Sequence, residues 1–134
     1  MRWVLLATLV LAACKEDVAD LPALVAITAE SAGFYCQMSL LEHDGPKGQV
    51  HLDGMPAPLF SSQVRDAVAY LHMPEQSHAV RVTYVQDMTG ATWAEPGPWI
   101  RAKAALYVIG SDRVGGMGAR LSRLPGGSHG EQKP

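Results

Sequence analysis

The chain has 134 residues, of which 48% are hydrophobic and 18% are charged, and its formal net charge at pH 7 is −2. This balance is typical of a globular domain and excludes a chain that is disordered throughout. A nearly neutral chain lacks the basic face of a nucleic-acid binder, so we expect no nucleic-acid partner. The longest apolar run, residues 3–13, is shorter than the roughly 20 residues of a membrane-spanning helix.

The first 14 residues have the pattern of an export signal. Arg2 supplies a positive charge, residues 3–10 are apolar, and Leu-Ala-Ala-Cys at 11–14 resembles a bacterial lipobox. We therefore expect a signal helix over residues 1–13, cleavage before Cys14, and a lipid on the Cys14 sulfur. The alternative is an ordinary signal peptide in which this cysteine has no role. Acylation would place the chain in the periplasm, anchored to a membrane, with the outer membrane favoured over the inner.

The segment after the signal is expected to be a tether. Residues 14–32 mix charges, alanines and a proline without sustained amphipathic spacing. A short helix over residues 21–27 is the alternative.

The first regular elements that the sequence predicts form a hairpin. Val50 and Leu52 alternate with polar residues, which is the pattern of a half-buried strand over residues 49–53. Asp-Gly-Met-Pro at 53–56 is turn-forming, and a second short strand is expected through residues 58–60.

A helix and a third strand are predicted after the hairpin. Ser61 or Ser62 is the expected N-cap, and Pro74 stops the helix. An apolar stripe at helical spacing would pack on the hairpin. The stripe consists of Val64, Ala67, Val68 and Leu71. Residues 79–86 predict a strand with one apolar face, formed by Val80, Val82 and Tyr84. The result is an α+β fold with a ββαβ unit, in which an antiparallel sheet packs on one helix.

Two further segments follow this unit. Residues 104–109 are apolar on both faces and predict a well-covered strand, which would begin a second, incomplete unit. Residues 120–134 have no periodicity and are expected to form a disordered tail.

Cys36 and Met38 are candidate ligands of a soft metal ion. The chain has two cysteines, so acylation of Cys14 leaves Cys36 without an internal disulfide partner. Such a thiol is a buried inert group, an intermolecular disulfide, a redox centre or a metal ligand. On an extended segment, residues two apart point the same way, and paired sulfur ligands select Cu(I). The Cys and His spacing of a zinc finger is not present.

A series of short motifs then makes a resemblance specific. In chain order they are Phe-Tyr-Cys-Gln-Met at 34–38, Glu-His at 42–43, Gly-Pro-Lys-Gly-Gln at 45–49, Phe-Ser-Ser-Gln-Val-Arg-Asp-Ala at 60–67, Tyr-Val-Gln-Asp-Met at 84–88, Tyr-Val-Ile-Gly-Ser at 107–111 and Gly-Met-Gly at 116–118. Together they resemble the NosL family of nitrous oxide reductase accessory lipoproteins.

The resemblance implies a non-enzymatic periplasmic Cu(I) chaperone. Such a protein supplies copper for the tetranuclear sulfide-bridged site of nitrous oxide reductase. It docks on an ABC-type membrane complex with a periplasmic component, and it has two similar ββαβ halves. Residues 33–119 would then be the copper-binding domain, with Cys36 and Met38 as ligands. The candidates for a third ligand are Met88, Met117 and His43.

The chain departs from the family pattern at two places. The family usually has glycine where this chain has Gln37, which is harmless unless the backbone φ is positive there. Family members continue after residue 118 with a strand, a helix and a last strand, and residues 120–134 show none of these. A truncated or frame-shifted reading of the gene would give such an end.

Two other functions remain open from the sequence. Cys36 could support a thiol-dependent redox or lyase-like activity, although no second cysteine is available for dithiol chemistry. The chain could also be a truncated, non-functional lipoprotein remnant. The remaining histidines of the body are expected at the surface and not in a site; these are His51, His72 and His78.

Overall fold

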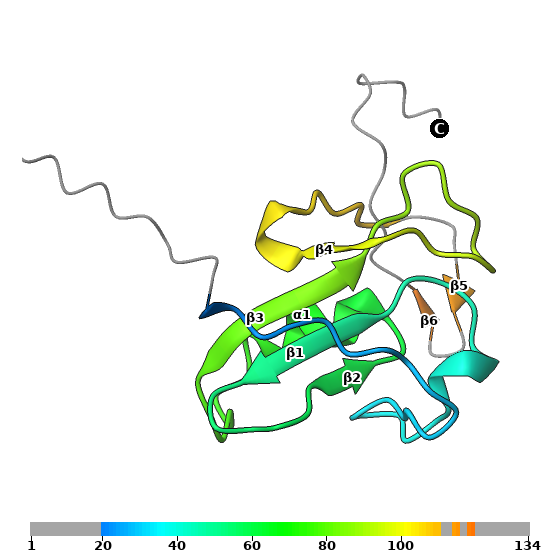
Figure 1. Ribbon diagram of the computed structural model, residues 1–134. Coiled ribbons are helices and arrows are strands. Elements are labelled where there is room, and N and C mark those ends of the chain that lie inside the picture. The colour runs from blue at the N-terminus through cyan, green and yellow to red at the C-terminus, as the bar shows by residue number, and fades with distance from the viewer. Residues whose placement is uncertain (1–19, 111–113, 116–117, 120–134) are drawn as a thin grey trace, which may run out of the picture.

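A four-stranded antiparallel sheet with the strand order β2-β1-β3-β4 forms the centre of the computed structural model (Figure 1). Residues 20–110, 114–115 and 118–119 are described by the structure. The strands of the sheet are β1 (Gly48–Leu52), β2 (Leu59–Ser61), β3 (Val80–Gln86) and β4 (Trp99–Arg101). The other elements are helix α1 (Val64–Tyr70), the 3₁₀ helices η2 (Leu40–Glu42) and η3 (Ala102–Ala104), and a separate ladder of β5 (Val114–Gly115) and β6 (Gly118–Ala119).

The predicted α+β class is confirmed, and the elements β1, β2, α1 and β3 follow the predicted ββαβ order. The predicted signal helix, Cys14 and residues 120–134 lie outside the described residues. Within the described part of the chain, no helix has the length and apolar character needed to cross a membrane.

One face of the sheet packs on α1 as the sequence predicts. Val50 and Leu52 form a buried apolar cluster with Ala67 and Tyr70 of the helix. Gly48 lies on the same face, and a Cβ added there would be 2.5 Å from the Ala67 Cβ. The missing side chain therefore lets β1 and α1 approach each other closely.

Helix α1 begins without the predicted serine cap. Its N-cap residue is Gln63, and no side chain makes a capping hydrogen bond. The expected caps are used elsewhere, because Ser61 ends strand β2 and Ser62 contacts Cys36. The helix ends at Tyr70, before the predicted stop.

Strand β3 is irregular where the prediction assumed strict alternation. Its register against β1 shifts between His51 and Leu52. Val80 consequently packs against the apolar cluster on the helix side. Tyr84 pairs with Gln49 and lies on the opposite face. The predicted common face for the three alternating residues of this strand is therefore wrong, because a bulge changes the face that a side chain occupies.

Residues 20–27, here called the strap, cross the sheet on the side opposite α1 (Figure 1). The Val25 backbone N–H donates a hydrogen bond to Gln49 Oε1 at 3.1 Å, and Gln49 Nε2 donates to the Val25 carbonyl at 2.7 Å. The Tyr84 hydroxyl donates to the Pro22 carbonyl at 3.0 Å. The side chains of Gln49 and Tyr84 thus supply the hydrogen-bond partners that the backbone of a neighbouring strand would otherwise supply.

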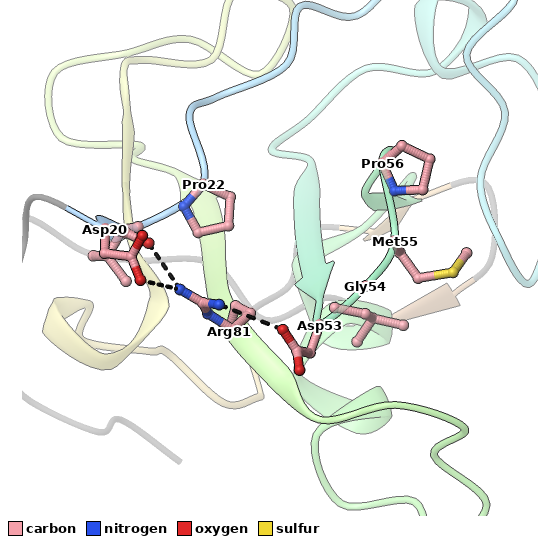
Figure 2. A pocket seen from close by; sticks show the side chains of 9 residues that line it. Asp20, Pro22, Asp53, Gly54, Met55, Pro56 and Arg81 are labelled. Carbon is pink, nitrogen blue, oxygen red and sulfur yellow. Dashed lines mark hydrogen bonds and ion pairs between the residues drawn. The ribbon is translucent and has the colours of Figure 1, made fainter.

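Arg81 fixes the start of the strap (Figure 2). Its guanidinium lies 2.8 Å from the carboxylate of Asp20 and 3.4 Å from that of Asp53. These residues and Met55 line an open hollow of about 520 Å³. The segment predicted as a tether, residues 14–32, is thus bound to the sheet from Asp20 onward, and the strap is extended instead of helical.

The strand predicted over residues 104–109 is wrong. The strand lies earlier, at Trp99–Arg101, and is followed directly by η3. The Tyr107 hydroxyl then donates to the Ala102 carbonyl at 2.8 Å, which turns the chain back onto the sheet. An apolar run does not ensure that both faces of a segment are covered, and the large side chains left exposed are Leu106 (64%) and Ile109 (85%).

Candidate metal site

Cys36 lies in a tight turn formed by residues 33–38. The Gly33 backbone N–H donates to the Met38 carbonyl at 3.0 Å, and the Gln37 N–H donates to the Gly33 carbonyl at 2.8 Å. The residues on either side pair as a single antiparallel bridge. The prediction that Cys36 and Met38 lie on an extended segment is therefore wrong. Both residues belong to one closed turn.

Gln37 has the backbone conformation that the sequence analysis identified as the harmful case. Its φ is 54°, in the left-handed region that favours glycine. Its side chain compensates in part, because Nε2 donates a hydrogen bond to the Phe34 carbonyl at 2.7 Å. The turn is thus formed without glycine at this position.

The Cys36 sulfur is half-buried between two structural elements. Its Sγ lies 3.3 Å from the Oγ of Ser62, at the junction of β2 and α1. A Cβ added to Gly33 would lie 2.5 Å from the same sulfur. The sulfur therefore occupies space that any other residue at position 33 would fill.

Aromatic side chains fix the turn against α1. The Phe34 ring makes edge-to-face contacts with the rings of Tyr35 and Tyr70, at centroid distances of 5.0 and 6.0 Å. The Tyr35 hydroxyl donates to the Sδ of Met73 at 2.9 Å. Burial raises the pKa of Tyr35, so this hydroxyl keeps its proton at neutral pH. Met73 is an exposed thioether that the sequence analysis missed, because no spacing rule relates it to Cys36.

The other predicted ligands come from different segments of the chain, except for Met38, which shares the turn with Cys36. Met38 and Met88 are half-buried, the latter in the loop after β3. His43 lines a hollow of about 160 Å³ whose walls do not include Cys36, Met38 or Met88. The His43 carbonyl accepts a hydrogen bond from Lys47. Met117 lies outside the described residues. Over residues 20–110, no three His, Cys, Asp or Glu side chains gather into a metal-binding group.

His51 is not at the surface, as predicted, but buried under the strap. Its Nε2 lies 3.2 Å from Gln49 Oε1, and its ring meets the Tyr84 ring edge-to-face. Desolvation by burial lowers its pKa below the ordinary value. The imidazole is therefore a neutral part of the polar network that holds the strap.

Comparisons with known proteins find a matching family model and two similar relatives that are named as copper-binding lipoproteins. The NosL family model matches residues 24–125. The copper-binding lipoprotein NosL of Achromobacter cycloclastes is 56% identical over 125 residues, which cover 89% of this chain and 65% of that protein. The protein of the same name from Stutzerimonas stutzeri is 32% identical over 110 residues, which cover 81% of this chain and 57% of the relative. The chain thus spans less than two thirds of the length of either relative.

A solved structure has the same fold. The crystal structure of the copper chaperone NosL from Shewanella denitrificans superposes with a TM-score of 0.69 at 30% sequence identity. The match covers 76% of this chain and 78% of that one.

Proposed function

The chain belongs to the NosL family, and on this premise we propose that it is a Cu(I) carrier for the copper-sulfide site of nitrous oxide reductase. The names of its relatives, copper-binding lipoprotein and copper chaperone, support copper binding. The observation that carries the proposal is the closed turn that contains both Cys36 and Met38, each of them half-buried.

The ligand chemistry supports Cu(I) as the cargo. A thiolate and a thioether are soft ligands, and soft ligands favour Cu(I) over harder divalent ions. The thioether is neutral, so the site would depend chiefly on the Cys36 thiolate. Two protein ligands also leave coordination positions open for a third ligand or for the acceptor. Such a site suits a protein that must release its metal without an enzymatic step.

The proposal includes a location and a partner. Acylation at Cys14 would anchor the chain to a membrane facing the periplasm, in line with the lipoprotein names of its relatives. The acceptor would be the ABC-type membrane complex with its periplasmic component. Intact-mass spectrometry of the membrane fraction should show residues 14–134 plus lipid. A soluble, unmodified mature chain would contradict the anchor.

Competition with Cu(I) chelators tests the carrier function. Cys36→Ser replaces a soft ligand by a hydroxyl and should nearly abolish Cu(I) binding. Met38→Leu keeps the volume and removes the sulfur, so it should weaken binding without unfolding the chain. Met55→Leu is the matched control, because Met55 lies at the far hairpin turn, in the hollow under Arg81. Wild-type affinity in Cys36→Ser would refute the proposal.

The same assay identifies a third ligand. Each candidate is changed singly to a residue that cannot bind copper: Met88→Leu, Met117→Leu and His43→Gln. The variant that weakens binding beyond the Met55→Leu control identifies the ligand.

A further inference from the structure

The Ser62 hydroxyl is the hydrogen-bond partner of the Cys36 sulfur. The two atoms lie 3.3 Å apart, and Ser62 is only 3% exposed. On another side of the sulfur, the Gly33 backbone lies so close that an added Cβ would be 2.5 Å away. The Cys36 sulfur thus has the buried Ser62 hydroxyl on one side and the Gly33 backbone on another. The half-buried Cys36 side chain remains partly open to solvent.

The structured backbone on both sides of Ser62 fixes its position, and its hydroxyl does not cap the helix that follows. Ser61, the preceding residue, pairs with Gly48 at the sheet edge, and Gln63, the next residue, is the N-cap of α1. A serine at the start of a helix ordinarily caps it. Helix α1 has no side-chain cap, so the Ser62 hydroxyl is directed to the sulfur instead.

This contact serves both the empty and the copper-loaded protein. A free thiol can donate its hydrogen to Ser62 Oγ, as the geometry shows. A copper-bound sulfur has no hydrogen, but a hydroxyl carries one donor and two acceptor positions and can rotate to donate. Hydrogen bonds to metal ligands commonly fix ligand orientation and tune metal affinity.

We propose that Ser62 is a positioning residue for copper: its hydroxyl donates a hydrogen bond to the copper-bound Cys36 sulfur, and Gly33 leaves the space in which that sulfur is held. The inference rests on the proposed function. It assigns Ser62 no direct bond to the metal. It predicts that copper approaches from the solvent side, which is also the side open to an acceptor.

The test compares two adjacent serines by the same substitution. Ser62→Ala should weaken Cu(I) binding about 10-fold in a chelator competition, the usual lower range for loss of such a hydrogen bond. Ser61→Ala should leave the affinity unchanged, because Ser61 is buried in the same strand end without a hydrogen bond to the sulfur. Ser62→Thr keeps the hydroxyl and should restore binding if its extra methyl is accommodated.

A spectroscopic readout separates positioning from a general structural effect. Loss of a hydrogen bond to the thiolate raises the energy of the sulfur electrons. The ultraviolet charge-transfer band of the Cu(I) complex should therefore move to longer wavelength in Ser62→Ala and stay in place in Ser61→Ala. The position of this band tests the role of Ser62 even if the Ser62→Thr variant does not fold.

The outcomes distinguish the two proposals. If Cys36→Ser binds Cu(I) like the wild type, the carrier function fails. If Cys36→Ser loses binding while Ser62→Ala keeps both the affinity and the band of the wild type, only the role of Ser62 is overturned. Equal weakening in both serine variants, with no shift of the band, would also overturn it.

Discussion

The two faces of the sheet are covered in different ways. On the helix side, α1 packs through apolar contacts among Val50, Leu52, Ala67 and Tyr70. On the other side, the strap is held by hydrogen bonds from Gln49 and Tyr84 and by the ion pairs of Arg81. Every residue of β1 is consequently buried, although its side chains alternate between the two environments.

The difference separates two sources of specificity. Apolar packing tolerates many side chains of suitable volume, whereas the strap depends on specific hydrogen bonds, such as those between the Gln49 amide and the backbone N–H and carbonyl of Val25. The strap precedes the turn of residues 33–38 that carries Cys36 by a short connection. Changes on either face can therefore be used to separate fold stability from copper binding.

The largest effect is expected from Gln49→Ala. The change removes both hydrogen bonds to Val25 and the partner of His51. We expect the free energy of unfolding to fall by about 2–4 kcal/mol, measured by denaturant unfolding. The control is Gln76→Ala, because Gln76 makes one hydrogen bond, to the Tyr70 carbonyl. An equal loss in both variants would show that the strap adds nothing specific.

Gly48→Ala should instead disturb the packing between β1 and α1, and it should lower the free energy of unfolding by about 1–3 kcal/mol. The new methyl would meet the Ala67 Cβ at 2.5 Å and force α1 away from β1. The double variant with Ala67→Gly restores the space, so it should be more stable than the sum of the single changes predicts. Additive effects in this double-mutant cycle would contradict the close approach.

The strap side should also be the pH-sensitive side. Burial lowers the pKa of His51 below its ordinary value of 6.5 in the folded chain. As the pH falls through that value, the unfolded chain binds a proton that the folded chain does not. Stability is therefore full above about pH 6.5 and is lost toward the lower, folded pKa. Unfolding measured from pH 7.5 to 5 should show a smaller loss in His51→Gln than in the wild type.

The smallest effect on stability is expected at Gln37, in the turn formed by residues 33–38. Gln37→Gly relieves the left-handed strain but loses the hydrogen bond to Phe34 and adds freedom to the unfolded chain. The free energy of unfolding should change by less than about 0.5 kcal/mol. Gln37→Val places a branched side chain at positive φ and should cost about 1–2 kcal/mol. Equal stability of the two variants would show that the turn relaxes.

The helix side could be predicted from the sequence, and the strap side could not. Alternation at Val50 and Leu52 and the helical stripe from Val64 report apolar burial directly. Gln49 and His51 have the polarity of exposed residues, and their burial depends on a backbone segment more than 20 residues away. The bulge that separates Val80 from Tyr84 likewise has no sign in the composition of the strand.

The candidate site was predictable in its chemistry but not in its geometry. A soft sulfur pair at Cys36 and Met38 follows from the residue types alone. The closed turn does not, because the positive φ falls on Gln37 and not on a glycine. The sequence predicts Ser61 or Ser62 as a helix cap, because the contact of Ser62 with the sulfur arises only when residues 33–38 pack against the junction of β2 and α1.

The Arg81 ion pair with Asp20 has a consequence for the lipid anchor proposed at Cys14. If the chain were free through residue 32, its contour from Cys14 would allow the domain to move about 60 Å from its acyl chains. Binding of Asp20 to the sheet shortens this leash to about 20 Å. The volume within reach falls with the cube of that length, about 30-fold, and the local concentration of the domain at the membrane rises accordingly. Under the proposed function, copper transfer would then be confined to acceptors at the bilayer surface.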